Sequence, residues 1–313
     1  MVSIIIPCFN AEAWLDATIR SARAQTWPET EIIVVDDGSS DGSLALAHLH
    51  EGARVTVVSQ ENRGAAAARN RGLRLARGSF VQFLDADDLL SPDKVAAQME
   101  VLSDAPADSV ASCRWGRFRS DPSEAAFSDT AVFRDFIPAR DFLIHVAATS
   151  DMMHPASWLT PRAVAEAAGP WDESLSLNDD GEYFCRVLLR ASSIRYSPDG
   201  SVWYRSGLGG SLSGQISRRA MVSAHRSIAL FACHLLSADN SPQTRAALAI
   251  YWRRLQYELY PHAVDLSRDA GRRSRALGRA TVPLPFGPRL RALAAITGWR
   301  FARRIQGWLA PRG

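Results

Sequence analysis

One stretch of the chain, residues 78–90 with the sequence GSFVQFLDADDLL, limits most strongly how it can fold. An apolar run of β-forming residues ends there at three carboxylates, Asp85, Asp87 and Asp88. Parallel strands that are buried on both faces have nearly continuous apolar sequences, and open α/β sheets bind ligands beyond the carboxyl ends of their strands. The stretch therefore predicts a buried strand that carries acidic side chains to a ligand site.

The three carboxylates allow two interpretations. Like charges this close repel one another unless a cation lies among them, and Mg²⁺ and Mn²⁺ favour such oxygen ligands. Alternatively, the acidic residues form a solvated turn before a helix that begins near Pro92, because Ser91 and Pro92 are a typical helix start. This stretch alone favours neither interpretation.

The chain before this point alternates between strands and helices. We expect strands over residues 2–7, 31–35, 54–59 and 78–84, and helices over residues 11–24, 43–50 and 65–76. This alternation predicts an α/β fold with a mixed, mostly parallel central sheet. Polar side chains follow three of the strands: Asn10, the pair Asp36 and Asp37, and Asp85. Right-handed crossovers place these strand ends at one edge of the sheet, so we expect the polar side chains to converge.

The second half of the chain is less regular. We expect helices over residues 92–103, 139–147, 161–168 and 178–190, and strands over residues 109–119, 194–196 and 201–204. Beyond Ser217 the pattern is helical to the end of the chain. The sequence therefore predicts one domain over residues 1–215, followed by a helical region over residues 216–313.

Composition indicates a soluble globular protein. The chain has 313 residues, 47% of them hydrophobic, which suffices for a large core. Its four cysteines lie far apart without a CxxC pair, which favours a reducing compartment over a zinc site or a disulfide framework. We expect no signal peptide and no membrane span, because the N-terminus lacks a basic segment before an apolar one and no long apolar run occurs. The expected location is the cytoplasm.

The end of the chain has an unusual charge. Residues 268–313 contain eleven arginines and one acidic residue, Asp269. Over residues 297–309, helical periodicity gathers apolar side chains on one face and arginines on the other. The apolar set is Phe301, Ile305, Trp308 and Leu309, and the basic set is Arg300, Arg303 and Arg304. Such a helix can lie on an anionic membrane surface or pack on its own domain with solvated arginines, and both interpretations remain open.

Four segments, taken together and in order, resemble the family 2 glycosyltransferases, which have the GT-A fold. They are VSIIIPCFN at the N-terminus, IIVVDDGSSDGS, ENRGAAAARNRG leading to DADD, and LNDDGEYFCRVLL. The resemblance covers roughly residues 2–213, with a donor half up to about residue 105 and an acceptor half beyond it. It implies an inverting, metal-dependent glycosyltransferase that moves a sugar from a nucleotide-diphosphate sugar, with UDP favoured, to a hydroxyl acceptor in cell-surface polysaccharide or glycoconjugate synthesis.

The resemblance also implies roles for the donor-side residues. Asp87 matches the direct ligand of Mn²⁺ or Mg²⁺, and Asp85 the residue that faces the ribose or the metal's waters, while Asp88 either supports them or acts as a helix-start charge. A metal there neutralises the leaving diphosphate. The remaining matches are Asp36 and Asp37 at the base, Pro7 and Phe9 lining the base pocket, Gly64 and Arg69 near the donor, and Arg205 and Ser211 on a loop over the diphosphate. Arg69 either faces phosphate or pairs with a nearby carboxylate.

On the acceptor side, Asp180 matches the catalytic base, and Asp179 stands where the family usually has Glu. A carboxylate at a helix N-terminus stays ionised more readily and can take the proton of an acceptor hydroxyl. The alternative is that Asn178 or Asp179 only caps the helix and Asp180 is a first-turn acid. His154 and Trp158 fall where the acceptor wall is expected, although a lone His or Trp is often structural.

Two other functions compete with this interpretation. A sugar nucleotidyltransferase would need a Gly-rich basic loop just after the first strand, and the sequence IPCFNAEAW has none. A degenerate module that only binds nucleotide or glycan is disfavoured because Asp85, Asp87 and Asp180 are present together. We expect no nucleic-acid partner.

Overall fold

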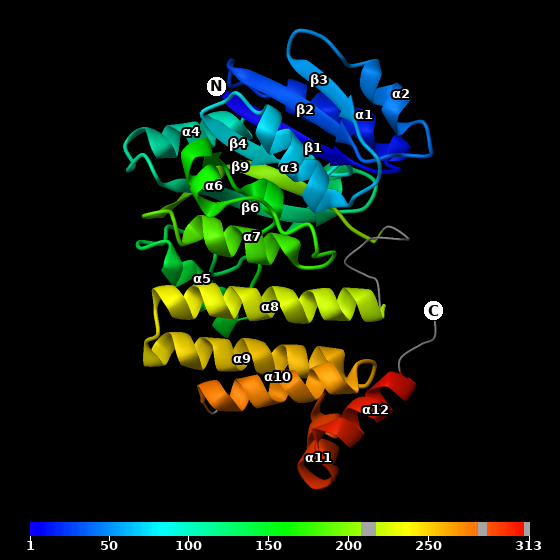
Figure 1. Ribbon diagram of the computed structural model, residues 1–313, viewed down its shortest axis with the longest axis vertical. Helices are drawn as coiled ribbons and strands as arrows, with labels where there is room; N and C mark the ends of the chain where they lie inside the picture. The colour runs from blue at the N-terminus through cyan, green and yellow to red at the C-terminus, as the bar shows by residue number, and fades with distance from the viewer. Residues whose placement is uncertain (150, 208–216, 279, 281–286, 310–313) are drawn as a thin grey trace.

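The structure, a computed structural model, describes the whole chain except residues 150, 208–216, 279, 281–286 and 310–313. Figure 1 shows the N-terminal strands at one end of the molecule, a stack of long helices below them, and the last two helices at the other end. The mixed α/β architecture, with a parallel-dominated sheet and a helical C-terminal region, agrees with the sequence prediction.

The first sheet has the strand order β3-β2-β1-β4-β8. Strands β1 (Val2–Cys8), β2 (Thr30–Asp36), β3 (Val55–Ser59) and β4 (Phe80–Phe83) are parallel, and β8 (Thr160–Pro161) pairs antiparallel with β4. Every residue of β1 and β2 is buried, as the apolar runs at their centres predict.

Helices cover both faces of this sheet. They are α1 (Glu12–Arg23), α2 (Ser43–His48) and α3 (Ala65–Leu75), whereas α4 (Lys94–Ser103) packs mainly on the second sheet. Successive residues of β1 point to opposite faces, so Ile4 shares one hydrophobic cluster with Leu15 of α1 and Ile5 shares the other with Ala68 of α3. A Cβ atom on Gly72 would lie 2.3 Å from Cγ2 of Ile5, so this glycine lets α3 lie directly on the sheet.

The second sheet has the order β5-β9-β6-β7. Its strands are β5 (Leu89–Leu90), β6 (Val110–Phe118), β7 (Ala126–Phe127) and β9 (Ile194–Arg205). The prediction of two separate strands over residues 194–204 is wrong. Strand β9 is continuous, and a bulge absorbs the interruption, because Cys113 pairs with Ser197 while Arg114 pairs with Ser201.

Short helices connect the two sheets to the rest of the chain. They are the 3-10 turns η1 (Pro122–Glu124) and η2 (Pro155–Ser157), and the α-helices α5 (Arg140–Ala148), α6 (Arg162–Ala168) and α7 (Asp179–Leu188).

The C-terminal helices pack directly on this domain. They are α8 (Arg218–Ala238), α9 (Pro242–Leu259), α10 (Val264–Leu277), α11 (Pro288–Thr297) and α12 (Trp299–Leu309). Phe231 of α8 and Trp252 of α9 belong to the same hydrophobic cluster as Tyr183 of α7 and Phe83 of β4. The predicted boundary near residue 215 therefore does not separate two cores. None of the described helices is long and apolar enough to cross a membrane.

Candidate active site

The carboxyl ends of β1, β2 and β4 lie side by side. The amide of Asp37 donates to the carbonyl of Cys8 over 2.8 Å, and the amide of Leu84 donates to the carbonyl of Ile5 over 2.9 Å. These bonds bring the polar residues that follow the three strands to one edge of the sheet. The predicted convergence is confirmed.

Asp37 is buried and held by the start of helix α3. Its Oδ1 accepts hydrogen bonds from Nε2 of Gln60 (2.7 Å) and the amide of Arg63 (3.0 Å), and its Oδ2 accepts one from the amide of Gly64 (2.7 Å). Gly64 has a φ of 92°, a conformation that favours glycine. The carboxylate therefore fixes the turn that begins α3.

The other residues predicted for the base pocket lie around Asp37. The amides of Gly38 and Ser39 donate to Oδ2 of Asp36, while its buried Oδ1 has no hydrogen-bond partner among the described residues. Pro7 is buried within β1, whereas Phe9 is 51% exposed just beyond the strand. Phe9 is thus available to a ligand at this edge, and Pro7 is a strand residue beneath it.

The aspartates after β4 form a tight turn, in which the amide of Asp88 donates to the carbonyl of Asp85 over 3.1 Å. Burial opposes ionisation of Asp85, but the guanidinium of Arg69, 2.7 Å from its Oδ1, outweighs burial and keeps the pKa of this carboxyl below its usual range. Asp87 has no side-chain partner within the described part of the chain. Burial, together with the charges of Asp88 and Asp85, raises its pKa to about 7. This turn concentrates negative charge that a cation would relieve.

Asp88 is fully buried and ties the turn to Arg205 and His154. Its Oδ1 accepts a hydrogen bond from the amide of Arg205 (2.8 Å), and its Oδ2 lies 3.1 Å from Nε2 of His154 in an ion pair. Although burial disfavours the charged imidazole, Asp88 raises the pKa of His154 above its ordinary value. This burial is unlike an exposed helix-start charge, so Asp88 is a supporting residue of the turn. Neither its spacing nor its neighbours in the sequence indicated the partnership with His154.

The donor set of this turn fits a divalent cation. Ligand atoms of Asp85, Asp88 and His154 all lie within 4.8 Å of one another. Carboxylate oxygens suit Mg²⁺ and Mn²⁺, and an imidazole nitrogen suits transition metals. This set differs from the predicted pair, Asp85 and Asp87. Asp87 lies on the same turn, and its carboxylate has no side-chain partner among the described residues.

Arg69 joins the aspartate turn to helix α7. Its Nη2 contacts Asp85, its Nη1 lies 2.9 Å from Oδ2 of Asp179, and its guanidinium carbon lies 4.5 Å from the ring centre of Trp171. The side chain is only 6% exposed. These contacts match the interpretation in which Arg69 pairs with nearby carboxylates, and its contact with phosphate stays a prediction.

Asp180 follows in the first turn of α7 and is half-buried. Burial, and next the charge of Asp179, raise the pKa of Asp180 to about 6, while Arg69 and His154 partly offset them. The proposed capping role of Asn178 is absent from the structure, because its Nδ2 donates to Oγ of Ser227 (2.7 Å) and its side chain makes no cap bond. The pKa of Asp180 therefore lies well above that of a free aspartate, which suits a carboxylate that takes up a proton.

Two serines of α8 hold the loop before Asp180. Oγ of Ser223 accepts from the amides of Ser176 (2.8 Å) and Leu177 (2.9 Å), and Oγ of Ser227 donates to the carbonyl of Asn178 (2.6 Å). Ser223 and Ser227 are one helical turn apart, so they share a face of α8. Sequence reasoning missed them, since serine at this spacing is common and carries no signal.

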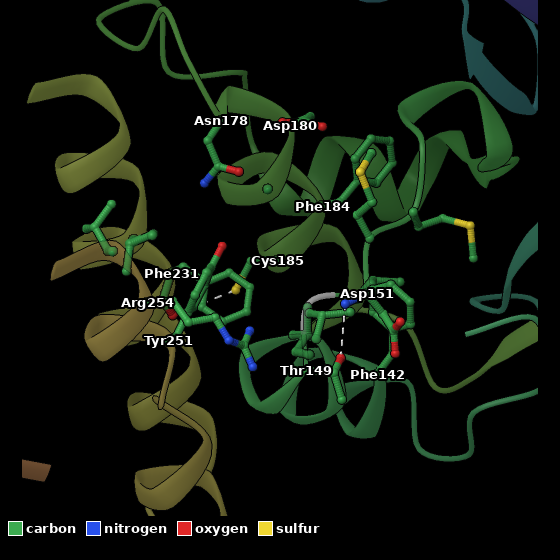
Figure 2. A pocket seen from close by; sticks show the side chains of 18 of the residues that line it. Phe142, Thr149, Asp151, Asn178, Asp180, Phe184, Cys185, Phe231, Tyr251 and Arg254 are labelled. Carbon is green, nitrogen blue, oxygen red and sulfur yellow. Dashed lines mark hydrogen bonds between the residues drawn. The ribbon is translucent and has the colours of Figure 1, made fainter. Parts of the chain in front are cut away.

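A cavity of about 300 Å³ lies beside this loop, between helices α5, α7, α8 and α9. Figure 2 shows that its lining includes Asn178 and Asp180 at the start of α7, together with Phe231 of α8 and Tyr251 and Arg254 of α9. Trp158 is 2% exposed, packs against Phe142 and Phe184, and forms part of the cavity wall. Trp158 is therefore mainly a core residue, which agrees with the structural alternative to a place in the acceptor wall.

Arg205 ends β9 and is already engaged. Its Nε donates to the carbonyl of Asp87 (2.9 Å), its Nη1 donates to the carbonyl of Arg119 (3.0 Å), and its guanidinium carbon lies 4.3 Å from the ring centre of Trp14. Through these contacts Arg205 holds the aspartate turn against the end of β9. Its contact with diphosphate stays a prediction. Ser211, the other residue predicted for this loop, lies outside the described residues.

Comparisons with known proteins all find glycosyltransferases. Residues 3–155 match the family model described as glycosyl transferase family 2. The putative teichuronic acid biosynthesis glycosyltransferase TuaG of Bacillus subtilis is 41% identical over 105 residues, or 33% of this chain and 42% of TuaG. The uncharacterized glycosyltransferase RT0329 of Rickettsia typhi is 30% identical over 200 residues, 63% of this chain and 61% of its own. This chain thus spans less than two thirds of the length of these curated relatives.

Solved structures share the fold. S. aureus TarS 1-349, crystallised with UDP-GlcNAc, matches with a TM-score of 0.73 at 18% identity, covering 100% of this chain and 93% of that one. The mannosyltransferase PcManGT of Pyrobaculum calidifontis, in complex with GDP-Man and Mn²⁺, matches with a TM-score of 0.55 at 21% identity, covering 98% and 84%. The family model includes the aspartate turn, Arg69 and His154. Through residues 3–155, just under half of its length, this chain is similar to glycosyl transferase family 2.

Proposed function

We propose that this chain is an inverting, metal-dependent glycosyltransferase that moves a sugar from a UDP-sugar to a hydroxyl acceptor. The observation that carries this proposal is the arrangement around Arg69, which contacts Asp85 of the aspartate turn and Asp179 beside Asp180. A charged turn suited to a diphosphate and its metal therefore stands next to a carboxylate suited to deprotonate an acceptor.

A UDP donor is favoured by the neighbours and by the base-side residues. TarS, crystallised with UDP-GlcNAc and with UDP, matches this fold better than PcManGT, crystallised with GDP-Man. The exposed Phe9 offers a ring on which a base can stack. A carboxylate at Asp36 or Asp37 could accept the N3-H of uracil, and Oδ1 of Asp36 has no partner among the described residues.

The metal is Mn²⁺ or Mg²⁺ in this proposal, held at the aspartate turn by Asp85 and Asp87. Asp87 supplies an unpaired carboxylate, whereas Asp88 is already engaged by His154 and the amide of Arg205. When bound, the metal would neutralise the diphosphate leaving group. His154 and Asp88 would then keep the turn in place from below.

The chemistry at Asp180 is a single displacement. The acceptor oxygen forms a bond to the anomeric carbon, the bond from that carbon to the diphosphate oxygen breaks, and Asp180 takes the acceptor's hydroxyl proton. Attack opposite the leaving group inverts the configuration at the anomeric carbon. The acceptor would enter through the cavity beside Asp180, whose mostly apolar wall includes Trp158.

A role in cell-surface polysaccharide synthesis is supported by the relative TuaG, which is described as a putative teichuronic acid biosynthesis glycosyltransferase. That match covers only 33% of this chain, so it leaves the acceptor to experiment.

Calorimetric titration tests the donor and the metal together. UDP, GDP and dTDP are each added to the purified chain with Mn²⁺ and again with EDTA. We expect UDP to bind most tightly, and only with metal. Binding of GDP or dTDP instead would correct the base. Metal-independent binding of a nucleotide would contradict the metal site, and binding of none would favour the degenerate module.

A further inference from the structure

Helix α12 packs on α9 through only one of its faces. Ala302 is fully buried, Gln306 accepts a hydrogen bond from Oη of Tyr257, and the ring of Trp299 lies 5.4 Å from that of Tyr260. Helices α11 and α12 lie at the end of the molecule farthest from strands β1 to β3 (Figure 1). The contacts with α9 fix which face of α12 points outward.

The outward face of these two helices is apolar. Trp308 is 90% exposed and Phe301 is 48% exposed on α12, and Ile296 of α11 is 85% exposed. Trp308 and Phe301 are seven residues apart, which places them on the same side of the helix. Ile305 is half-buried beside them, and the side chain of Leu309 is not among those described.

The same region is strongly basic. Residues 270–313 contain ten arginines and no aspartate or glutamate. Arg300 and Arg304 are exposed at the border between the two faces of α12, with guanidinium carbons 6.0 Å and 5.7 Å from the ring centre of Tyr260, and Arg289 and Arg291 are exposed on α11. Arg303 differs from the expectation, because it lies on the packed side, with its guanidinium carbon 4.6 Å from the ring centre of Tyr257.

We propose that the outward face of α12, defined by Phe301 and Trp308 with Arg300 and Arg304, docks on an anionic lipid surface. Aromatic side chains prefer the interface between acyl chains and water, and arginines beside them attract acidic headgroups. The absence of acidic residues over 44 consecutive positions favours a uniformly negative partner. Arg272 and Arg273 of α10 already pair with Asp269. Arg300 and Arg304 have no acidic partner among the described residues, and an anionic surface would supply one.

Both interpretations of the tail are thereby combined. One face of α12 packs on the protein, as an amphipathic helix on its own domain would, and the other face is free to contact lipid, as an interfacial helix would. The proposal goes beyond sugar transfer and does not depend on it. It would place the chain peripherally on the inner face of the cytoplasmic membrane.

Vesicle flotation with the full chain tests the proposal. The vesicles are pure phosphatidylcholine, or phosphatidylcholine mixed with phosphatidylglycerol, each at low and high salt. We expect flotation only with phosphatidylglycerol, and weaker flotation at high salt. Trp308→Ser should reduce the bound fraction about ten-fold. Arg300→Gln and Arg304→Gln should each weaken binding about five-fold.

Matched controls are available elsewhere on the surface. Leu49 is 85% exposed and Arg54 is exposed on the first half of the chain, so Leu49→Ser and Arg54→Gln should leave flotation unchanged. No flotation of the wild type, or equal flotation with both lipids, would overturn the proposal. A second result would also overturn it: a wild-type protein that does not bind vesicles but forms a concentration-dependent dimer, which Trp308→Ser dissociates. This face would then join two copies of the chain.

Discussion

The guanidinium of Arg69 on helix α3 donates a hydrogen bond from Nη1 to Oδ2 of Asp179 on helix α7, over 2.9 Å. The two residues are 110 positions apart in the sequence. Because Arg69 also contacts Asp85, one buried cation orders the aspartate turn and the start of α7 together. The relative position of the aspartate turn and the start of α7, which carries Asp180, therefore depends on this side chain.

Arg69→Met should destabilise the protein by about 3–5 kcal/mol, because it leaves Asp85 and Asp179 without their cation in a partly buried site. Urea denaturation measures this change. Arg63→Met is a matched control, since Arg63 is paired with Glu173 but its side chain is 63% exposed, and it should cost about 1 kcal/mol or less. Equal losses of unfolding free energy for the two variants would show that the Arg69 contacts stabilise the protein no more than an exposed ion pair does.

The serines of α8 should affect catalysis more than stability. Ser223→Ala frees the amides of Ser176 and Leu177, so the loop before Asp180 loses its fixed position, and kcat should fall about ten-fold. Ser237→Ala on the same helix is the control, because Ser237 is exposed and its one hydrogen bond to a described residue is with the carbonyl of Cys233. If both variants turn over like the wild type, α8 does not position the base.

The metal ligands can be separated by calorimetry with Mn²⁺. Asp87→Asn should weaken Mn²⁺ binding more than about ten-fold, because it removes the unpaired carboxylate of the turn. His154→Gln should have a smaller effect, since His154 is paired with Asp88. The reverse order would assign the metal to Asp85, Asp88 and His154 instead.

The pH dependence follows from the raised pKa of Asp180, about 6. A base works only when deprotonated, so kcat/KM should rise about ten-fold per pH unit below pH 6 and level off above it. Initial rates measured at saturating metal across this range test the expectation. A rate that is unchanged between about pH 5 and pH 8 would show that no group of this pKa acts as the base.

Much of the fold follows from local patterns. The strands before residue 85 have long apolar runs, and parallel topology brings the residues after them, such as Asp37 and Asp85, to one edge. The continuous strand β9 was missed because residues 198–200 bulge out of the ladder, which no local pattern reveals. The two-residue strand β8 depends only on its antiparallel partner β4 and has no sequence signal of its own.

The site was harder to predict than the fold. The pairs of Asp88 with His154 and of Arg69 with Asp179 join distant parts of the chain, and each residue alone has an ordinary structural explanation. The family resemblance assigned Arg205 to diphosphate, and this contact stays a prediction; its position at the end of β9 directs its Nε to the carbonyl of Asp87, which the sequence did not indicate. Long-range packing, which spacing does not reveal, decides these roles.

The most direct test of the account compares wild type and Asp180→Asn with a UDP-sugar, Mn²⁺ and a panel of hydroxyl acceptors. The measured quantities are UDP release and, separately, the calorimetric affinity for UDP. We predict that transfer falls by about 100-fold to 10,000-fold while UDP affinity is retained. Transfer by Asp180→Asn at a rate comparable with the wild type would contradict the assignment of Asp180 as the base.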